Sequence, residues 1–105
     1  MKEYKVEITK EALSDMEAIY EYIANDLLAP EYAIGQYNRI AKAILKLSYF
    51  PEKYRVMQSE KERQREMRRM VVDNYSVFYL IRGERVIVTN VLYSASDIEA
   101  RLLEE

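Results

Sequence analysis

The sequence predicts an α+β fold of element order β-α-α-β-β-β-(α), in which a helical hairpin packs on an antiparallel sheet. The length, 105 residues, allows a single domain, 1–105, with one modest core. Half of the residues are hydrophobic and only two are glycine and two proline, which is typical of a compact globular chain. Apolar residues recur at helical spacing before Phe50 and at every second position after Glu66, which indicates helices followed by strands.

The first predicted strand and helix lie within residues 4–27. Residues 4–8 alternate apolar and charged side chains, and the hydroxyl of Thr9 can then cap a helix by accepting from its free amides. Hydrophobic residues at three- and four-residue steps predict an amphipathic helix: Leu13, Met16, Ile19, Tyr20, Ile23 and Leu27. Leu28-Ala29-Pro30 interrupts it, and Pro30 suits the first position of the next helix.

A second amphipathic helix is predicted from Pro30 to near Phe50. Its apolar face carries Ala33, Tyr37, Ile40, Ala41, Ile44 and Leu47. It should end near Phe50 because the residue before a proline resists helical geometry. The short break between the helices predicts an antiparallel hairpin. Residues 53–66 are polar and charged, and we expect a loop or a frayed turn there.

Three strands are predicted over residues 67–72, 75–81 and 84–92, which are rich in valine, isoleucine and aromatic residues. Asp73-Asn74 and Arg82-Gly83 separate them as hairpin turns. The second of these strands is apolar on both faces, whereas a helical hairpin covers only one face of a sheet. Part of the other face therefore needs a cover, either a bound partner or a short final helix. Such a helix would be capped by Ser94 or Ser96 and would carry Ile98, Leu102 and Leu103.

The composition excludes several classes of function. Cysteine and histidine are both absent, so the chain has no disulfide, no thiol nucleophile and no imidazole base or ligand. We therefore expect no metal and no cofactor, and neither a zinc enzyme nor a Ser-His hydrolase. No stretch approaches the ~20 apolar residues of a membrane helix. Residues 1–5 lack the apolar run of a signal peptide, so we expect a cytoplasmic protein without membrane contact.

The net charge of −2 conceals a basic segment between Lys53 and Arg69. Its cations are Lys53, Arg55, Lys61, Arg63, Arg65, Arg68 and Arg69, against Glu60, Glu62 and Glu66. This segment could face an anionic partner, although charge alone favours a solvated, salt-bridged loop. Tyr54, between two of these cations, is the ring best placed to stack on a base.

An ordered set of short motifs is similar to that of the RelE/ParE toxins. The motifs are Thr9-Lys10-Glu11-Ala12, Ile19-Tyr20-Glu21-Tyr22-Ile23, Tyr49-Phe50-Pro51-Glu52, Arg68-Arg69-Met70-Val71-Val72, Asn74-Tyr75-Ser76-Val77-Phe78-Tyr79, and Val91-Leu92-Tyr93 followed by Asp97. They span nearly the whole chain, and the element order deduced above agrees with that fold.

The resemblance implies the toxin of a type II toxin–antitoxin module, the kind of growth inhibitor associated with plasmid stabilization. Its partner would be a cognate antitoxin, whose C-terminal segment wraps the toxin and neutralises it. Toxins of the RelE branch cut messenger RNA on the ribosome, whereas toxins of the ParE branch poison DNA gyrase. The target of this chain would accordingly be gyrase or the ribosome and its mRNA.

Position 75 favours the ParE branch. In RelE-like nucleases a key arginine lies near the start of the third strand, and the resemblance places Tyr75 there. A tyrosine cannot give phosphate a permanently charged, bidentate grip. We therefore expect a ParE-like, non-enzymatic binder of gyrase or a similar target. The alternatives are a RelE-like, metal-independent mRNA endoribonuclease and a non-toxic relative that still binds antitoxin.

The catalytic candidates for the nuclease alternative are weak. They are Arg69, Arg55 and Lys61, acting with Tyr93. The phenol of Tyr93 would need strong activation by its surroundings to act as acid or base. The other interpretation of Tyr93 is a strand-end residue with its ring in the core and its hydroxyl in water.

The residues predicted to bind a partner are Arg68, Arg69, Tyr75, Tyr79 and Tyr93. Strand alternation sends Arg68 and Arg69 to opposite faces, so only one of them can enter a shared cleft. The alternative role for either is that of an edge-strand arginine that prevents aggregation. Tyr79 lies in an apolar pattern, as Tyr20 and Tyr37 do, and such tyrosines usually pack in the core or at its rim.

Overall fold

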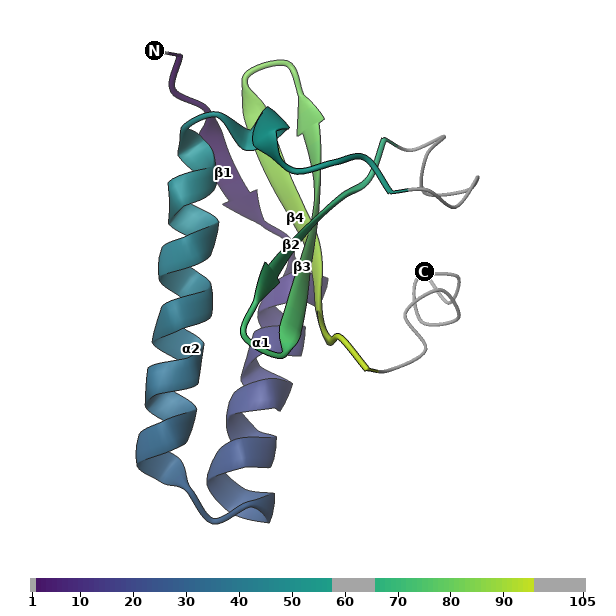
Figure 1. The fold of residues 1–105 in the computed structure, drawn as a ribbon. Coiled ribbons are helices and arrows are strands. Elements are labelled where there is room, and N and C mark those ends of the chain that lie inside the picture. Colours follow the sequence, from purple (N-terminus) through teal and green to yellow (C-terminus); the bar gives the residue numbers. More distant parts are fainter. Residues whose placement is uncertain (1, 58–65, 96–105) are drawn as a thin grey trace.

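The computed structural model describes residues 2–57 and 66–95 (Figure 1). Within them, two helices pack on a four-stranded sheet, which confirms the predicted α+β class. The elements are β1 (Lys5–Ile8), α1 (Lys10–Glu21), a π-helical segment (Tyr22–Asp26), α2 (Pro30–Leu45), two 3₁₀ turns (Lys46–Ser48 and Pro51–Lys53), β2 (Arg68–Val72), β3 (Tyr75–Arg82) and β4 (Arg85–Tyr93). The predicted final helix and Lys61 lie outside the described residues.

The sheet is mixed, with strand order β1-β4-β3-β2, so the prediction of an antiparallel sheet is wrong for one strand pair. The pairs β2–β3 and β3–β4 are antiparallel, but β1 pairs with β4 in parallel, with Val6 opposite Val86. The reason is that α1 leads away from the sheet and α2 returns, so that β2 runs in the direction of β1 (Figure 1). Each of the two hairpins that follow reverses the chain, so β4 runs in the same direction as β2 and β1. The pairing of β4 with β1 is therefore parallel.

Both hairpin turns lie where the sequence predicts them. Asp73 adopts a φ of 54° in the β2–β3 turn, and Gly83 adopts a φ of 61° in the β3–β4 turn. Glycine enters this left-handed region without steric cost, and aspartate tolerates it better than most residues.

The first helix begins as predicted, because Thr9 caps it. The hydroxyl of Thr9 accepts from the backbone amide of Ala12 and donates to the carbonyl of Thr89 on β4. The second helix begins at Pro30, as predicted, but ends at Leu45, before the predicted end near Phe50. There the chain tightens into a 3₁₀ turn, and Phe50 then takes a left-handed φ of 50°.

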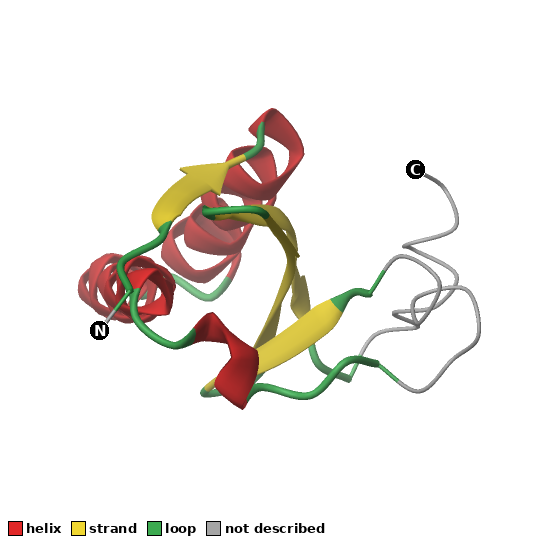
Figure 2. Ribbon diagram, turned by 90° about the horizontal axis from the view of Figure 1, so that it is seen from above, coloured by secondary structure: helices red, strands yellow, loops and turns green. Residues whose placement is uncertain are grey.

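The main core lies between the helices and one face of the sheet. Viewed from above, both helices lie on the same side of the sheet (Figure 2). Met16, Ile40, Ile44, Val77 and Val88 are among its buried members. A second, smaller cluster on the opposite face joins Met67, Phe78 and Leu92, with Met57 and Leu80 packed against it. The segments that flank β2 and the 3₁₀ turn thus contribute side chains to the face that the helices leave uncovered.

Candidate partner-binding groove

A groove of about 610 Å³ opens where the hairpin end of the helices meets the ends of β3 and β4. We call it the tyrosine groove. Its lining residues are Asp15, Ala18, Ile19, Tyr22, Ile23, Leu27, Tyr32, Gln36, Asn74, Tyr75, Val91, Leu92 and Tyr93. Four of these thirteen residues are tyrosines, and the groove brings together two of the predicted site residues, Tyr75 and Tyr93.

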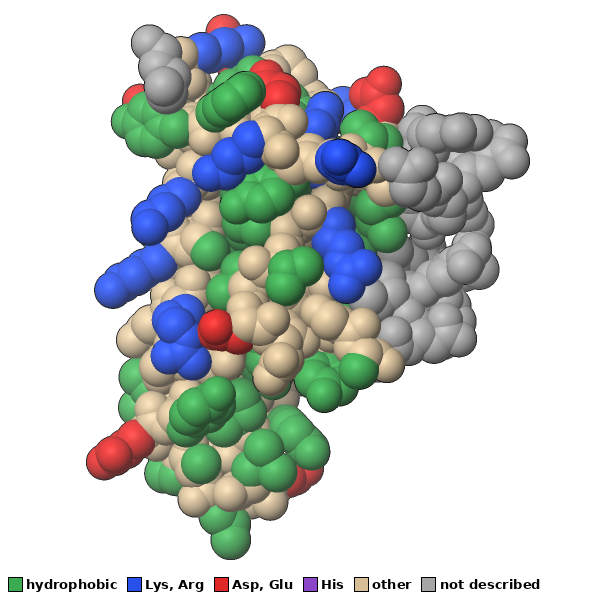
Figure 3. Space-filling view, in the orientation of Figure 1, with side chains coloured by type: hydrophobic (Ala, Val, Ile, Leu, Met, Phe, Trp, Pro, Cys, Tyr) green, Lys and Arg blue, Asp and Glu red, His purple; other side chains and the backbone are tan. Residues whose placement is uncertain are grey.

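The walls of the tyrosine groove are apolar and open to solvent. Tyr22 is 52% exposed, Leu27 55%, Tyr32 58% and Tyr93 51%. The rings of Tyr75 and Tyr93 meet edge to face, with their centroids 5.8 Å apart. Hydrophobic side chains also gather around the turn between the helices, at the lower end of the molecule in Figure 3. Exposed aromatic and aliphatic residues concentrated in one concave site are typical of a protein–protein interface.

A π-helical segment shapes the wall formed by Tyr22 and Leu27. The amide of Leu27 donates to the carbonyl of Tyr22, which makes a wider turn than the α-helix that precedes it. The amide of Ala29 then reaches back to Ile23, and Leu28 adopts a φ of 55° while 81% of it is exposed. Short π segments and left-handed residues other than glycine occur preferentially at functional sites.

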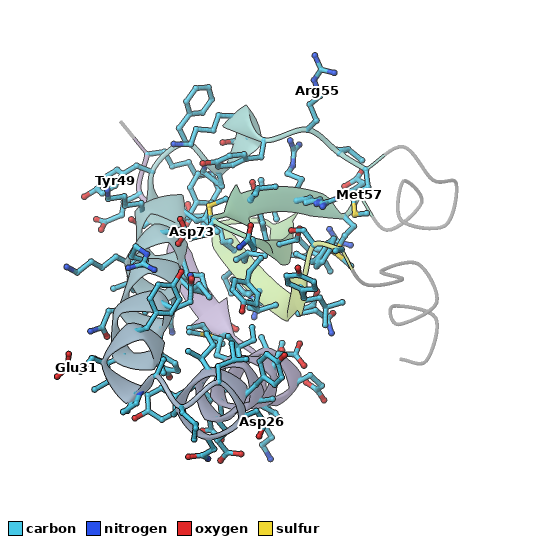
Figure 4. The ribbon with its side chains drawn as sticks, turned by 60° about the horizontal axis from the view of Figure 1, so that its bottom comes forward. Asp26, Glu31, Tyr49, Arg55, Met57 and Asp73 are labelled. Carbon is cyan, nitrogen blue, oxygen red and sulfur yellow. The ribbon has the colours of Figure 1, made fainter. Side chains whose placement is uncertain are left out.

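A polar network closes one end of the groove. The Asp73 carboxylate accepts from Nε2 of Gln36 at 3.0 Å and from Nε of Arg39 at 2.8 Å. These donors lower the pKa of Asp73, the Arg39 bond most strongly. The network fixes the β2–β3 turn against α2, between the helix and the sheet as seen in Figure 4. Asp15, on the groove floor, accepts from the amide of Val91 at 3.0 Å and so ties α1 to β4.

The chemistry of the groove suits binding better than phosphodiester cleavage. Among the described residues that line it, none is lysine or arginine. Burial raises the pKa of Tyr75, and the hydroxyls of Tyr32, Tyr93 and Tyr22 raise it further. Tyr75 is therefore a neutral phenol near pH 7, which is a poor general base. The charge of a phosphorane would also lack cationic stabilisation here.

The two predicted arginines lie on opposite faces of the sheet, as strand alternation predicts. Nη1 of Arg68 donates to the carbonyls of Glu52 and Tyr54, at 3.1 and 2.6 Å. Nε of Arg69 donates to the hydroxyl of Ser76 at 2.8 Å. Each arginine thus holds a neighbouring segment in place, and neither lines the tyrosine groove.

The prediction of Tyr79 as a partner-binding residue is corrected. Its side chain is completely buried, so it belongs to the core, as its apolar surroundings in the sequence indicate. Its hydroxyl donates to the carbonyl of Pro51 at 2.6 Å, and burial raises the pKa of Tyr79 strongly.

The ring of Tyr54 packs edge to face on the ring of Tyr79, with the centroids 6.5 Å apart, which disfavours base stacking by Tyr54. Arg55 is exposed and extends away from the body of the molecule (Figure 4).

Eleven of the thirteen groove residues were not predicted as site residues, among them the exposed Tyr22, Leu27 and Tyr32. Tyr22 and Tyr32 are not among the helix positions predicted to face the core. An aromatic residue at a position predicted to face solvent is the sequence feature that could have marked them as binding residues. In the described part of the chain, no cluster of three or more aspartate, glutamate, histidine or cysteine residues could hold a metal ion. No described helix is long and apolar enough to cross a membrane.

Comparison with known families settles which kind of protein has this groove. The family described as "ParE toxin of type II toxin-antitoxin system, parDE" matches residues 6–98. The chain belongs to this family. No curated protein matches the sequence of this ParE-family chain.

Solved structures share the fold of this ParE-family chain at low sequence identity. It is similar to a chain of the chromosomal ParDE toxin–antitoxin system from P. aeruginosa, with a TM-score of 0.74 and 16% identity over 89% of this chain and 98% of that one. It is also similar to a chain of the RelBE2 toxin–antitoxin complex from Mycobacterium tuberculosis, with a TM-score of 0.61 and 19% identity over 91% of this chain and 97% of that one. These likenesses confirm the expected RelE/ParE-like fold.

Proposed function

We propose that this chain inhibits growth as the toxin of a type II module, and that a cognate antitoxin neutralises it by occupying the tyrosine groove. The observation that carries the proposal is the exposure of Tyr22, Leu27, Tyr32 and Tyr93 around a single groove. Membership of the ParE family and the likeness to chains of toxin–antitoxin systems support an antitoxin as the occupant.

The groove favours an apolar peptide segment as its ligand. A volume of about 610 Å³ accommodates a few aliphatic or aromatic side chains. Tyrosine rings give a large contact area at low entropic cost, and buried aromatic anchors dominate the energy of many interfaces. We infer that an amphipathic antitoxin segment places its apolar side chains between Tyr32 and Tyr93.

We propose DNA gyrase, in the cytoplasm, as the target, in preference to messenger RNA. The family assignment supports the ParE type of activity. The absence of lysine and arginine among the described lining residues, together with Tyr75 in place of a phosphate-binding arginine, weighs against RNA cleavage in the groove.

The binding proposal is tested with the product of the neighbouring open reading frame. The double variant Tyr22→Ala/Tyr32→Ala removes two exposed rings and should weaken binding at least ~10-fold in calorimetry, a typical loss for interface aromatics. Leu45→Ala is the matched control, because Leu45 is 64% exposed and does not line the groove. Equal affinities for the double variant and the control, at unchanged melting temperature, would exclude the groove as the antitoxin site.

A further inference from the structure

A second groove, of about 510 Å³, lies on the opposite side of α2 from the acidic first helix and is lined by cations. We call it the basic groove. Its lining residues are Arg39, Lys42, Ala43, Lys46, Leu47, Lys53, Tyr54 and Met70. None of these eight is acidic. The charges come from the second half of α2, from the 3₁₀ turn Lys46–Ser48 that follows it and from the 3₁₀ turn Pro51–Lys53, segments that the fold brings to one surface.

The overall charge of −2 conceals this asymmetry. The α1 and π segments carry Lys10 against five acids: Glu11, Asp15, Glu17, Glu21 and Asp26. The chain from Arg39 to Arg55 instead carries five cations against Glu52: Arg39, Lys42, Lys46, Lys53 and Arg55. Figure 3 shows lysine and arginine side chains gathered along the upper half of α2 and beside it. A local cationic surface on an acidic protein indicates a polyanionic partner.

Three of the groove's cations are available to such a partner. Arg39 is engaged, because its Nε bonds to Asp73 at 2.8 Å. Lys42 and Lys46 are exposed, and neither enters an ion pair among the described residues. Lys53 holds its ammonium 5.3 Å above the centroid of the Tyr54 ring and enters no ion pair within the described part of the chain.

The spacing suits a phosphate backbone. Lys42 lies in the last turn of α2 and Lys46 begins the 3₁₀ turn that continues it, so the two lysines stand one turn apart, ~6 Å along the axis. Each DNA strand presents a phosphate every ~3.4 Å of axis, so these lysines can reach neighbouring phosphates. The apolar lining residues Leu47 and Met70 are buried, so the groove presents positive charge to a partner rather than apolar surface.

We propose that the basic groove binds the phosphate backbone of duplex DNA, with Lys42, Lys46 and Lys53 as its contacts. The charge arrangement alone indicates a polyanion, whereas the choice of DNA over RNA rests on the proposed gyrase target. The Tyr54 ring packs edge to face on buried Tyr79, which leaves the groove without a free ring for stacking a single strand. The contact is independent of base sequence, because it reaches only phosphates.

The test is fluorescence anisotropy of the full chain with a labelled 20-base-pair DNA duplex, between about 50 and 200 mM salt. Contacts with three phosphates predict a slope of log K against log salt near about −2.7, with a Kd of roughly 10⁻⁴ to 10⁻⁶ M at physiological salt. The variant Lys42→Glu/Lys46→Glu should weaken binding at least ~10-fold and flatten the slope, since two of the three contacts are lost.

A matched charge reversal outside the basic groove distinguishes the effect of the groove lysines from the effect of the net charge of the protein. Lys5→Glu/Lys10→Glu changes the net charge by the same amount at two exposed lysines outside the groove, and should weaken binding less than ~3-fold. Equal losses in both variants, no binding by the wild type at 50 mM salt, or tighter binding to single-stranded RNA of equal length would each overturn the proposal.

The DNA proposal and the antitoxin proposal fail separately. The variant Lys42→Glu/Lys46→Glu should bind the product of the neighbouring reading frame with unchanged affinity, because both lysines lie outside the tyrosine groove. Loss of DNA binding with antitoxin binding intact supports two independent sites. Loss of both in this variant, at unchanged melting temperature, would contradict that assignment.

Discussion

At the scale of single residues, one buried hydroxyl on the sheet hydrogen-bonds to the 3₁₀ turn at Pro51–Lys53. Tyr79 is fully buried and donates to the carbonyl of Pro51. Tyr79→Phe leaves that carbonyl without this donor, and we expect a loss of about 1–2 kcal/mol in the free energy of unfolding. Urea denaturation measures it. Tyr49→Phe, which removes a hydroxyl from a half-exposed ring, is the control and should change stability little.

The carboxylate of Asp73 makes stability depend on acid pH. Its pKa is lowered in the folded chain, chiefly by Arg39 and then by Gln36. A lowered folded-state pKa stabilises the fold above the ordinary pKa near about 4, and this contribution disappears as the pH falls through the folded value. The melting temperature should therefore fall with acidification below about pH 4.

The variant Asp73→Asn isolates this contribution. It should melt lower than the wild type at neutral pH and lose less on acidification, because the charged acceptor for Arg39 is gone. Glu52, whose pKa is lowered mainly by the hydroxyl of Tyr4, contributes to the acid dependence that remains. If wild type and variant showed parallel melting temperatures from pH 7 to about pH 2, the role given to Asp73 would be wrong.

At the scale of elements, the hydroxyl of Thr9 joins the start of α1 to β4. It accepts from the amide of Ala12 and donates to the carbonyl of Thr89. Thr9→Ala removes both bonds and should cost about 1–2 kcal/mol of unfolding free energy. Thr9→Ser keeps the hydroxyl and should cost much less. Equal losses in the two variants would show that the methyl group, and not the cap, carries the effect.

Most element boundaries were predictable because local chemistry determines them. The cap at Thr9, the proline at position 30 and the turn residues Asp73 and Gly83 all act within a few residues of chain. The parallel pairing of β1 with β4 was not predictable in this way, because the two strands meet only after the helical hairpin has returned the chain. The π segment after Glu21 also carries no distinctive sequence signal.

At the scale of the whole molecule, the fold separates two surfaces with different chemistry. The tyrosine groove joins residues of the helical hairpin to the start of β3 and the end of β4. The basic groove joins α2 to the two 3₁₀ turns that follow it and to β2. Two residues of the tyrosine groove, Tyr75 and Tyr93, were predicted, because they lie at strand ends and within motifs shared with the family. The contribution of Tyr22 and Tyr32 depends on tertiary packing, which periodicity along one helix does not specify.

The most direct test of the proposed gyrase-type toxin is its induced expression in a bacterium, with DNA damage response and messenger RNA integrity followed in the same cultures. We predict growth arrest, a DNA damage response and full-length transcripts, with growth restored by co-expression of the neighbouring reading frame. Growth arrest with transcripts cut inside translated codons, and without a DNA damage response, would contradict the account and would make the chain a ribosome-dependent nuclease.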